Sequence, residues 1–389
     1  MWAKKNMQIL NHTISKLKKS KPFHNTTLGV CLQITKETAV LLIGLQELGA
    51  KVVCCGGNPL TTQDDITAFL GSHGITIFAW SNQTKSEYDW CQNQVLKQKP
   101  DIITDDGGDL NIKAHKTRLN ILGATEETTT GLTRYHSMQK HGKLHYPIIA
   151  VNNAKTKMLF DNQYGTGQST IDGFLQAMNL LFASKRIVIA GYGWLGKGVA
   201  KRCKGMGAKI IITEVDPIKA LEAHMDGLEV MPMSRAAKIG DIFITCTGMR
   251  DIITKKTLLS MKNGAIVGNV GHFDVEIDAK FLLSQKIRQV RPNLDECILP
   301  NHKKIYLVSK GRVANLIASE GHPAEIMALS FSNQLYSILY ILKNHKKMKN
   351  QVYSVPQEID DQIAQDALQS ANIKIDKLTK KQLHYQTSW

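Results

Sequence analysis

Three short polar segments carry the side chains whose types and spacing could perform acid–base chemistry. They read DDGGD (105–109), EETTTG (126–131) and KTKMLFDNQYGTGQS (155–169). In the third segment Lys157 and Asp161 stand four residues apart, so a helix would place them on one face. A partly desolvated lysine there would have a lowered pKa and could accept a proton from a hydroxyl group. A surface ion pair is the alternative, and it is the commoner role of such a pair.

The acidic segments have both a structural and a chemical interpretation. Asp105 and Asp106 before two glycines are typical of a turn, but adjacent carboxylates at a strand end can also supply an acid or a base. Glu127 lies before three threonines, which predict either helix capping or contacts to an amide-bearing ligand. His272 and His322 each follow a glycine, and a lone histidine is more often structural than catalytic.

A glycine-rich turn after a β-branched run predicts a dinucleotide site. The run RIVIA predicts a strand, and GYGWLGKG predicts the turn, whose glycines are Gly191, Gly193 and Gly196. These glycines would let the backbone approach a pyrophosphate, whose charge then lies at a helix N-terminus. Glu214 ends the next strand and would accept hydrogen bonds from ribose hydroxyls, which favours NAD over NADP, although Lys219 nearby weakens that preference. The polar segments would then serve a hydride transfer.

Two α/β units must position this chemistry. From Thr27 onward, short apolar runs alternate with helical stretches, which is typical of a parallel sheet, and a second such series starts at Lys185. We therefore predict an α/β protein with two doubly wound parallel-sheet domains. The substrate-binding domain would comprise residues 1–155 and 323–350, the Rossmann NAD-binding domain residues 156–322, and a C-terminal arm residues 351–389.

Composition limits the classes of partner. The chain of 389 residues has a formal charge of +16, but its lysines are scattered, so we expect a solvated basic surface and no nucleic-acid partner. The seven cysteines include no CxxC pair, and no apolar stretch approaches the length of a membrane span. We therefore expect a cytoplasmic protein with reduced cysteines, no membrane segment and no bound metal.

Taken together, these segments resemble the adenosylhomocysteinase family from about residue 22 to the C-terminus. The segments NPLTTQDD, DDGGDL, EETTTG, FDNQYGTGQS, AGYGWLGKG, TEVDP, GHFDVEID and GRVANL…GHP occur in the family order. The ending LTKKQLHYQTSW and Thr166 resemble the shorter archaeal and thermophilic-bacterial form. That form lacks the Lys- and Tyr-bearing tail through which longer members contact NAD of a neighbouring subunit.

The resemblance implies reversible hydrolysis of S-adenosyl-L-homocysteine with tightly bound NAD. In that reaction the ribose 3′-hydroxyl is oxidised, the 4′ proton is removed, homocysteine leaves from C5′, water adds, and the ketone is reduced to give adenosine. The residues that match catalytic positions are Asp106, Glu127, Lys157, Asp161 and His272. Those that match cofactor positions are Thr128, Thr129, Thr130, Asn162, Gly191, Gly193, Trp194, Leu195, Gly196, Glu214, Lys219, Val270, Gly271 and Asn315.

The substrate positions match less completely. They are Gln33, Thr35, Glu37, Thr38, Asn58, Asn152 and His322. A carboxylate at Glu37 would accept a hydrogen bond from the 6-amino group and favour adenine over hypoxanthine, although some short-form relatives prefer an inosine-type base. Gln33 stands where the family has a histidine that helps to protonate the leaving group or to activate water, and an amide cannot exchange a proton near neutral pH. The step would be slowed or rerouted through Asp106.

Two alternatives remain open at this point. The same oxidation and elimination could act on another 5′-substituted nucleoside, which Gln33 and the basic surface favour. The chain could instead be a non-catalytic regulatory relative that binds NAD and nucleoside, although Lys157, Asp161 and His272 argue against it. We expect a small nucleoside thioether as substrate and a homotetramer or homodimer as the assembly.

Overall fold

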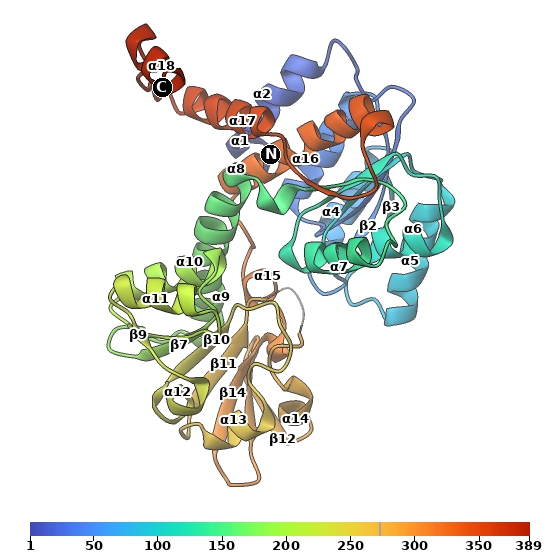
Figure 1. The fold of residues 1–389 in the computed structure, drawn as a ribbon. Helices are drawn as coiled ribbons and strands as arrows, with labels where there is room; N and C mark the ends of the chain where they lie inside the picture. Colours follow the sequence, from blue (N-terminus) through green and yellow to red (C-terminus); the bar gives the residue numbers. More distant parts are fainter. Residues whose placement is uncertain (272–273) are drawn as a thin grey trace.

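The computed structural model contains two open β-sheets with helices packed on them (Figure 1). It describes residues 1–271 and 274–389. The seven strands of the first sheet all pair in parallel. In spatial order they are β15 (Val352–Ser354), β6 (Ile148–Ala150), β5 (Gly123–Glu126), β4 (Ile102–Asp105), β1 (Thr27–Leu32), β2 (Lys51–Gly56) and β3 (Thr76–Phe78). The central strands are buried on both faces, as the apolar runs predict for a parallel sheet covered by helices.

Helices cover both faces of this sheet. They are α1 (Trp2–Asn6), α2 (Gln8–Leu17), α3 (Lys36–Glu47), α4 (Asp64–Ser72), α5 (Lys85–Lys97), α6 (Asp109–Thr117), α7 (Thr129–Lys140), α16 (Ala324–Asn344) and α17 (Gln357–Ser370). Helix α16 contacts α2, α3, β4 and β5 and is buried along most of its length. Two cap residues belong to the predicted site. Thr35 accepts from the Thr38 N–H at the start of α3, and Thr128 accepts from the Gly131 N–H at the start of α7.

The second sheet has eight strands. In spatial order they are β12 (Lys286–Arg291), β13 (Leu294–Ile298), β14 (Lys304–Val308), β11 (Ala265–Asn269), β10 (Ile242–Thr245), β7 (Arg186–Ala190), β8 (Lys209–Thr213) and β9 (Glu229–Val230). Its helices are α10 (Trp194–Gly205), α11 (Pro217–Met225), α12 (Met233–Ile239), α13 (Lys255–Ser260), α14 (Ala279–Leu283) and α15 (Ala314–Ile317). The predicted α/β class is confirmed, but β12–β13 and β13–β14 pair antiparallel, because tight turns at Asn293 and at residues 299–303 fold the chain back as two hairpins.

Both sheets have the same doubly wound order. The strands run β3-β2-β1-β4-β5-β6 in one and β9-β8-β7-β10-β11-β14 in the other. The order therefore reverses between β1 and β4 and between β7 and β10, and ligands of open sheets bind outside the strand ends at such points. The sequence places Gln33 and Asp106 at the first reversal and Gly191 at the second.

The segments between the sheets contain an unusual helix. The chain passes from η1 (Val151–Asn153) and α8 (Lys155–Lys157) into a π-helix, η2 (Met158–Gly165), and then α9 (Thr166–Met178), and it returns through η3 (Ser309–Gly311) and α15 to α16. π-helical turns are rare and often occur at functional sites. The predicted domain boundaries at residues 155 and 322 stay predictions.

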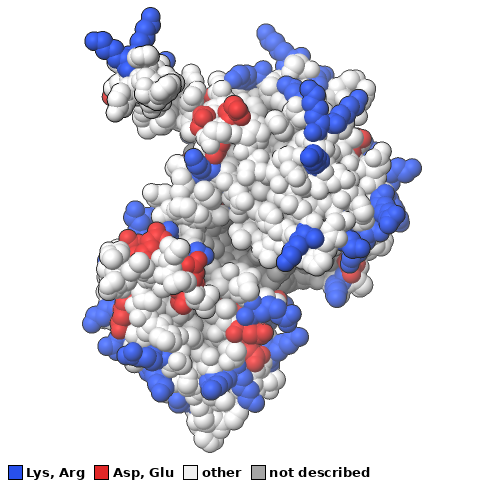
Figure 2. Space-filling view, viewed as in Figure 1, with Lys and Arg blue, Asp and Glu red and all other residues white. Residues whose placement is uncertain are grey.

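The C-terminal segment begins within the first sheet. After η4 (His345–Lys347), β15 pairs with β6, and α17 packs on α16 and α2. Only the residues after α17, including α18 (Lys380–Thr387), project from the body (Figure 1). Among the described residues no helix has the length and apolar character that crossing a membrane needs. Lysines and arginines are scattered over the face shown in Figure 2, as the sequence predicts.

Candidate active site

A cavity of about 1170 Å³ lies between the two sheets, at the reversal points of both (Figure 2). Its lining brings together the strand-end loops of the first sheet, the π-helix η2 and the glycine-rich turn after β7. The predicted site residues line this cavity with two exceptions. Gly196 lies behind the turn, and His272 lies outside the described residues.

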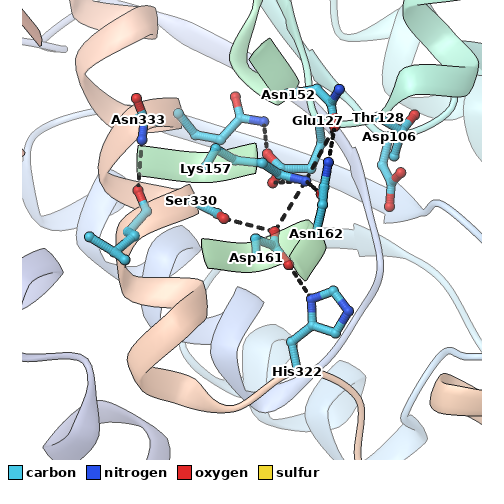
Figure 3. Close-up of polar contacts among 12 residues, drawn as sticks. Asp106, Glu127, Thr128, Asn152, Lys157, Asp161, Asn162, His322, Ser330 and Asn333 are labelled. Carbon is cyan, nitrogen blue, oxygen red and sulfur yellow. Dashed lines mark hydrogen bonds and ion pairs between the residues drawn. The ribbon is translucent and has the colours of Figure 1, made fainter. Parts of the chain in front are cut away.

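Lys157 is the centre of a buried polar network at the start of η2 (Figure 3). Its Nζ lies 3.2 Å from Asp161 Oδ2 and 3.7 Å from Glu127 Oε1. It donates to Asn162 Oδ1 at 2.7 Å and to Asn152 Oδ1 at 3.4 Å. The prediction that Lys157 and Asp161 share a helical face is confirmed, and the surface-pair alternative is wrong because both side chains are buried.

In the protein without ligands the pKa of Lys157 is raised, whereas the lowering expected beside a bound cofactor stays a prediction. Burial alone would lower the pKa, but the carboxylates of Asp161 and Glu127 outweigh it and raise the pKa above its usual range. Lys157 is therefore an ammonium group that donates to its neighbours, and it must transfer a proton before it can accept one.

Asp161 is held as a carboxylate by three neighbours. Burial would raise its pKa, but the charges of Lys157 and His322 keep the pKa well below its usual range. Ser330 Oγ donates to Asp161 Oδ2 at 2.8 Å, and His322 Nδ1 forms an ion pair with Oδ1. Asp161 is thus a fixed counter-ion across the pH range in which proteins work.

Glu127 differs from Asp161 although both flank the same lysine. Burial raises the pKa of Glu127 to about 7, opposed by the charge of Lys157. Its Oε2 accepts a hydrogen bond from Gln334 Nε2, and its backbone N–H donates to Asp105 O at 3.0 Å. A carboxyl group with a pKa near neutrality can gain or lose a proton during turnover.

Gln33 and Asp106 meet at the reversal point of the first sheet. Gln33 Nε2 donates to Asp106 Oδ2 at 2.9 Å, and Gln33 Oε1 accepts from the Thr61 hydroxyl. Both ends of the amide are therefore engaged, and Asp106 Oδ2 acts as an acceptor. Thr35 and Glu37 line the same end of the cavity, where burial raises the pKa of Glu37.

Sequence reasoning missed the polar residues of α16. Its apolar spacing predicts a core helix, yet Ser330, Asn333 and Gln334 are buried and directed toward the Lys157 network. Asn333 Nδ2 donates to Thr156 Oγ1 at 2.8 Å, beside Lys157. The sequence SFSNQ within an otherwise apolar helix was the available signal, because a buried helix face with four polar residues needs partners.

The glycine-rich turn fits a dinucleotide. Gly191 has a φ of +98°, and a Cβ on Gly196 would lie 2.1 Å from Gly191 O, so neither position tolerates a side chain. A Cβ on Gly193 would meet nothing within 4 Å, which leaves the backbone open to the cavity. No described side chain caps the N-terminus of α10, so its N–H groups are available to a pyrophosphate.

The acidic residue at the end of β8 is also in place. Glu214 Oε2 accepts from the Tyr192 N–H at 2.7 Å, and Oε1 accepts from the Val215 N–H at 2.7 Å. These bonds fix the carboxylate at the rim of the cavity, where ribose hydroxyls of a dinucleotide would lie. Lys219, which weakened the NAD preference on sequence grounds, lies 3.6 Å from Asp216 Oδ2.

Comparisons with known proteins agree with this site. Residues 1–120 match the family model described as S-adenosyl-L-homocysteine hydrolase, and residues 162–321 match the model of the NAD binding domain of that hydrolase. The second match confirms NAD as the predicted cofactor. Among solved structures, the dipicolinate synthase of Bacillus halodurans has a TM-score of 0.52 at 12% identity, over 82% of this chain and 99% of its own. At that identity the likeness shows the fold alone.

Three relatives match along the whole chain. The adenosylhomocysteinase of Sulfurisphaera tokodaii is 51% identical, covering 100% of this chain and 94% of the relative. The S-inosyl-L-homocysteine hydrolase of Methanocaldococcus jannaschii is 50% identical over 100% and 95%, and the adenosylhomocysteinase of Thermotoga maritima is 47% identical over 100% and 98%. On the strength of both domain matches and these full-length identities, the chain belongs to the S-adenosyl-L-homocysteine hydrolase family.

Proposed function

We propose that the protein hydrolyses S-adenosyl-L-homocysteine reversibly to adenosine and homocysteine, using tightly bound NAD. The observation that carries the proposal is a single cavity shared by the Lys157 network, the Gln33–Asp106 pair and the glycine-rich turn. A dehydrogenase needs only the Lys157 network and the glycine-rich turn. An elimination step also needs a base beside the sugar, and the carboxylate of Asp106 at the first reversal point supplies one.

The ribose oxidation would rest on Lys157 and Glu127. NAD, when bound, would supply the acceptor of the C3′ hydride and its donor in the reverse transfer. Lys157 must lose its proton before it can take one from the 3′-hydroxyl, and Glu127 at 3.7 Å is the neighbour whose pKa, about 7, suits that exchange. A cationic ring in the same cavity would favour the neutral lysine through like-charge repulsion. Asp161, held ionised, orients the ammonium group in either state.

The elimination step would rest on Asp106. Asp106 lines the cavity and accepts from the Gln33 amide through Oδ2, and a carboxylate at this place suits removal of the 4′ proton. Gln33 cannot carry a proton itself, because an amide neither gains nor loses one near neutral pH. We therefore assign the proton for the leaving thiolate to Asp106 in its protonated form, after it has removed the 4′ proton. The amide then serves to orient Asp106.

The base recognised is adenine in this proposal. Glu37 offers a carboxylate acceptor, which suits the 6-amino group and opposes the 6-oxo group of hypoxanthine. The relative from Methanocaldococcus jannaschii is named for the inosyl substrate at 50% identity, so the inosine thioether is the natural competitor to test. A different 5′-substituent remains the less favoured alternative, because the relatives above are named for homocysteine thioethers.

The test is a direct assay with the two thioethers. Purified protein with NAD⁺ is given S-adenosyl- or S-inosyl-homocysteine in parallel, and free thiol and NADH absorbance are followed. We expect thiol release, with the adenosine thioether at least about 10-fold faster in kcat/KM. NADH accumulation without thiol would favour another 5′-substituent, and absence of both signals would favour a non-catalytic relative.

We further propose a cytoplasmic homotetramer or homodimer. Helix α11 and the segment just before it expose large apolar side chains, namely Val215, Ile218, Leu221 and Met225, which a monomer would leave in water. The seven cysteines are free thiols and mostly buried, which suits a reducing compartment. Light scattering of the NAD-loaded protein at micromolar concentration measures the assembly, and a monomer would contradict this part of the proposal.

A further inference from the structure

A buried cluster of Asp105, Glu126 and Tyr135 lies beneath the turns that follow β4 and β5. All three side chains have no exposed surface, and none of them lines the cavity. Each acidic member directly precedes a site carboxylate, Asp106 or Glu127, in the sequence. The proposed reaction assigns no role to this carboxyl cluster, although its members belong to the same acidic segments.

Glu126 joins the two turns through one oxygen atom. Its Oε1 accepts from the Gly107 N–H at 2.9 Å, the Thr128 N–H at 3.0 Å and the Thr128 hydroxyl at 2.7 Å. Gly107 follows Asp106 in the β4 turn, and Thr128 follows Glu127 in the β5 turn. A single side chain therefore fixes the backbone beside both site carboxylates.

Asp105 completes the cluster from the other side. Its Oδ1 accepts from the Asp106 N–H at 3.0 Å, and its Oδ2 accepts from the Asn111 N–H at 2.7 Å. The Tyr135 hydroxyl lies 3.0 Å from Glu126 Oε2 and 3.5 Å from Asp105 Oδ2, so it bridges the two carboxyl groups.

Two glycines of the acidic segments make room for this cluster. A Cβ on Gly131 would lie 2.2 Å from Glu126 Cδ, and a Cβ on Gly108 would lie 2.9 Å from the Tyr135 hydroxyl oxygen. Gly108 also has a φ of +85°, which disfavours any side chain. Gly108 of DDGGD and Gly131 of EETTTG are thus explained by the cluster behind the site rather than by the site itself.

We propose that Glu126 is a positioning residue that, together with Asp105 and Tyr135, sets the placement of Asp106 relative to Glu127 and Thr128 and does so as a neutral carboxylic acid. The inference deepens the proposed function and rests on it for the roles of Asp106 and Glu127. It assigns no contact with substrate or cofactor to the cluster itself.

The hydrogen bonds show where the proton resides. Both oxygens of Asp105 accept backbone N–H groups, which favours the ionised form, whereas Glu126 Oε2 has the Tyr135 hydroxyl as its hydrogen-bond partner in the part of the chain that the structure describes. A proton on Oε2 lets Glu126 donate to Tyr135, which in turn donates to Asp105. No cation pairs with either carboxyl group among the described residues, and burial raises the pKa of Glu126 well above its usual range.

The kinetic test compares substitutions within the NAD-loaded protein. Glu126→Gln retains the pattern of a neutral acid and should keep kcat within about 3-fold, whereas Glu126→Ala should lower kcat by about 10- to 100-fold, since a misplacement of about 1 Å costs that much. Asp105→Asn should also lose activity, because its amide N–H₂ would face a backbone N–H. KM for the nucleoside should stay within about 2-fold, since Glu37 and Thr35 lie on α3 or at its cap.

Two tyrosines provide the matched control. Tyr135→Phe removes the bridging hydroxyl, and Tyr146→Phe removes an equally buried hydroxyl that donates to Asn111 Oδ1 at 3.1 Å instead. Both variants lose one buried hydroxyl group and should fold, but only Tyr135→Phe should lower kcat. Equal kcat values for the two, or a Glu126→Gln variant as slow as Glu126→Ala, would overturn the positioning role.

Infrared spectroscopy tests the proton without turnover. The carbonyl band of a buried neutral acid should be present at pH 7.5 in the parent protein, keep its intensity in Asp105→Asn, and fall in Glu126→Gln to the smaller component that Glu127, with a pKa of about 7, contributes in all three proteins. A fall in Asp105→Asn instead would overturn the assignment of the proton to Glu126. Because this band needs no substrate, absence of thiol release from the parent protein would contradict the proposed function alone.

Discussion

Replacing Lys157 by methionine tests the buried network most directly. The substitution keeps the aliphatic volume and removes the charge that lies 3.2 Å from Asp161 and 3.7 Å from Glu127. Breaking a buried ion pair from one side costs about 3–5 kcal/mol of unfolding free energy, because the remaining charges lose their compensation. At about 2–4 °C per kcal/mol, the melting temperature should fall by roughly 10 °C at pH 8.5.

The size of this loss should depend on pH through Glu127. Its folded pKa is raised from 4.5 to about 7, so the folded state loses stability as the pH rises from 4.5 through 7. At pH 6 Glu127 is already mostly neutral. Removal of Lys157 then leaves Asp161 as the charged carboxylate that loses this partner, and Asp161 still forms its ion pair with His322. Since one pKa unit corresponds to about 1.4 kcal/mol, the loss at pH 6 should be smaller by about 1–2 kcal/mol. The lysine itself has a raised pKa and contributes evenly over this range.

The assay pairs calorimetry with thiol release, and Lys155→Met is the control. Lys155 lies in the same helix, α8, with an exposed side chain, so its loss should change the melting temperature by less than about 1 °C. Lys157→Met should lower kcat by about 10²- to 10⁴-fold, as removal of a general base does. A Lys157→Met protein that melts and turns over like Lys155→Met would refute the assignment of Lys157 to proton transfer.

Three further substitutions test the ends of the cavity. Gln33→His should raise thiol release by up to about 10-fold, because an imidazole beside Asp106 can exchange protons, and no gain would contradict the inference that the missing proton carrier at position 33 slows the reaction. Glu37→Gln should reduce the preference for the adenosine over the inosine thioether by about 10-fold or more in kcat/KM, since an amide can both accept and donate; an unchanged ratio would remove Glu37 from base recognition. Glu214→Ser should bring the NAD and NADP dissociation constants closer together, measured by fluorescence titration of the apoprotein, and an unaltered ratio would show that another group selects the cofactor.

Local pattern was sufficient to predict the fold class. The β-branched run before the glycine-rich turn forms β7, and the acidic segment PDIITDDGGD forms β4 and the turn at its end. The antiparallel hairpin of β12 and β13 was not predicted, because the two apolar residues of KIRQVR, Ile287 and Val290, stand three apart, a spacing that does not show the alternation of a strand. The edge strand β15 was likewise placed in an arm, since three residues of a parallel edge leave little periodicity to detect.

The positions of site residues were predictable where spacing or a motif fixes the geometry. Their protonation states were not predictable, because these depend on charged neighbours distant in the sequence. Four-residue spacing placed Lys157 and Asp161 together, but their pKa values depend on Glu127 and His322, which lie far away in the sequence. Desolvation alone suggested a lowered lysine pKa, and two carboxylates reversed its sign. The sequence showed that Gln33 departs from the family pattern, whereas its hydrogen bond with Thr61 could be seen only in the structure.

The two carboxylates around Lys157 differ because their other neighbours differ. Asp161 receives the Ser330 hydroxyl and pairs with His322, so its ionised form is stabilised whether or not the lysine is charged. Glu127 accepts a hydrogen bond from the Gln334 amide and is buried, so its ionised form depends on the charge of Lys157. Environments that separate the pKa values of two acids assign them different tasks, one as counter-ion and the other as proton carrier. Among the described residues, Glu127 is therefore the member of the network suited to take a proton from Lys157, and the polar face of α16, which supplies both Ser330 and Gln334, is what makes the two acids unequal.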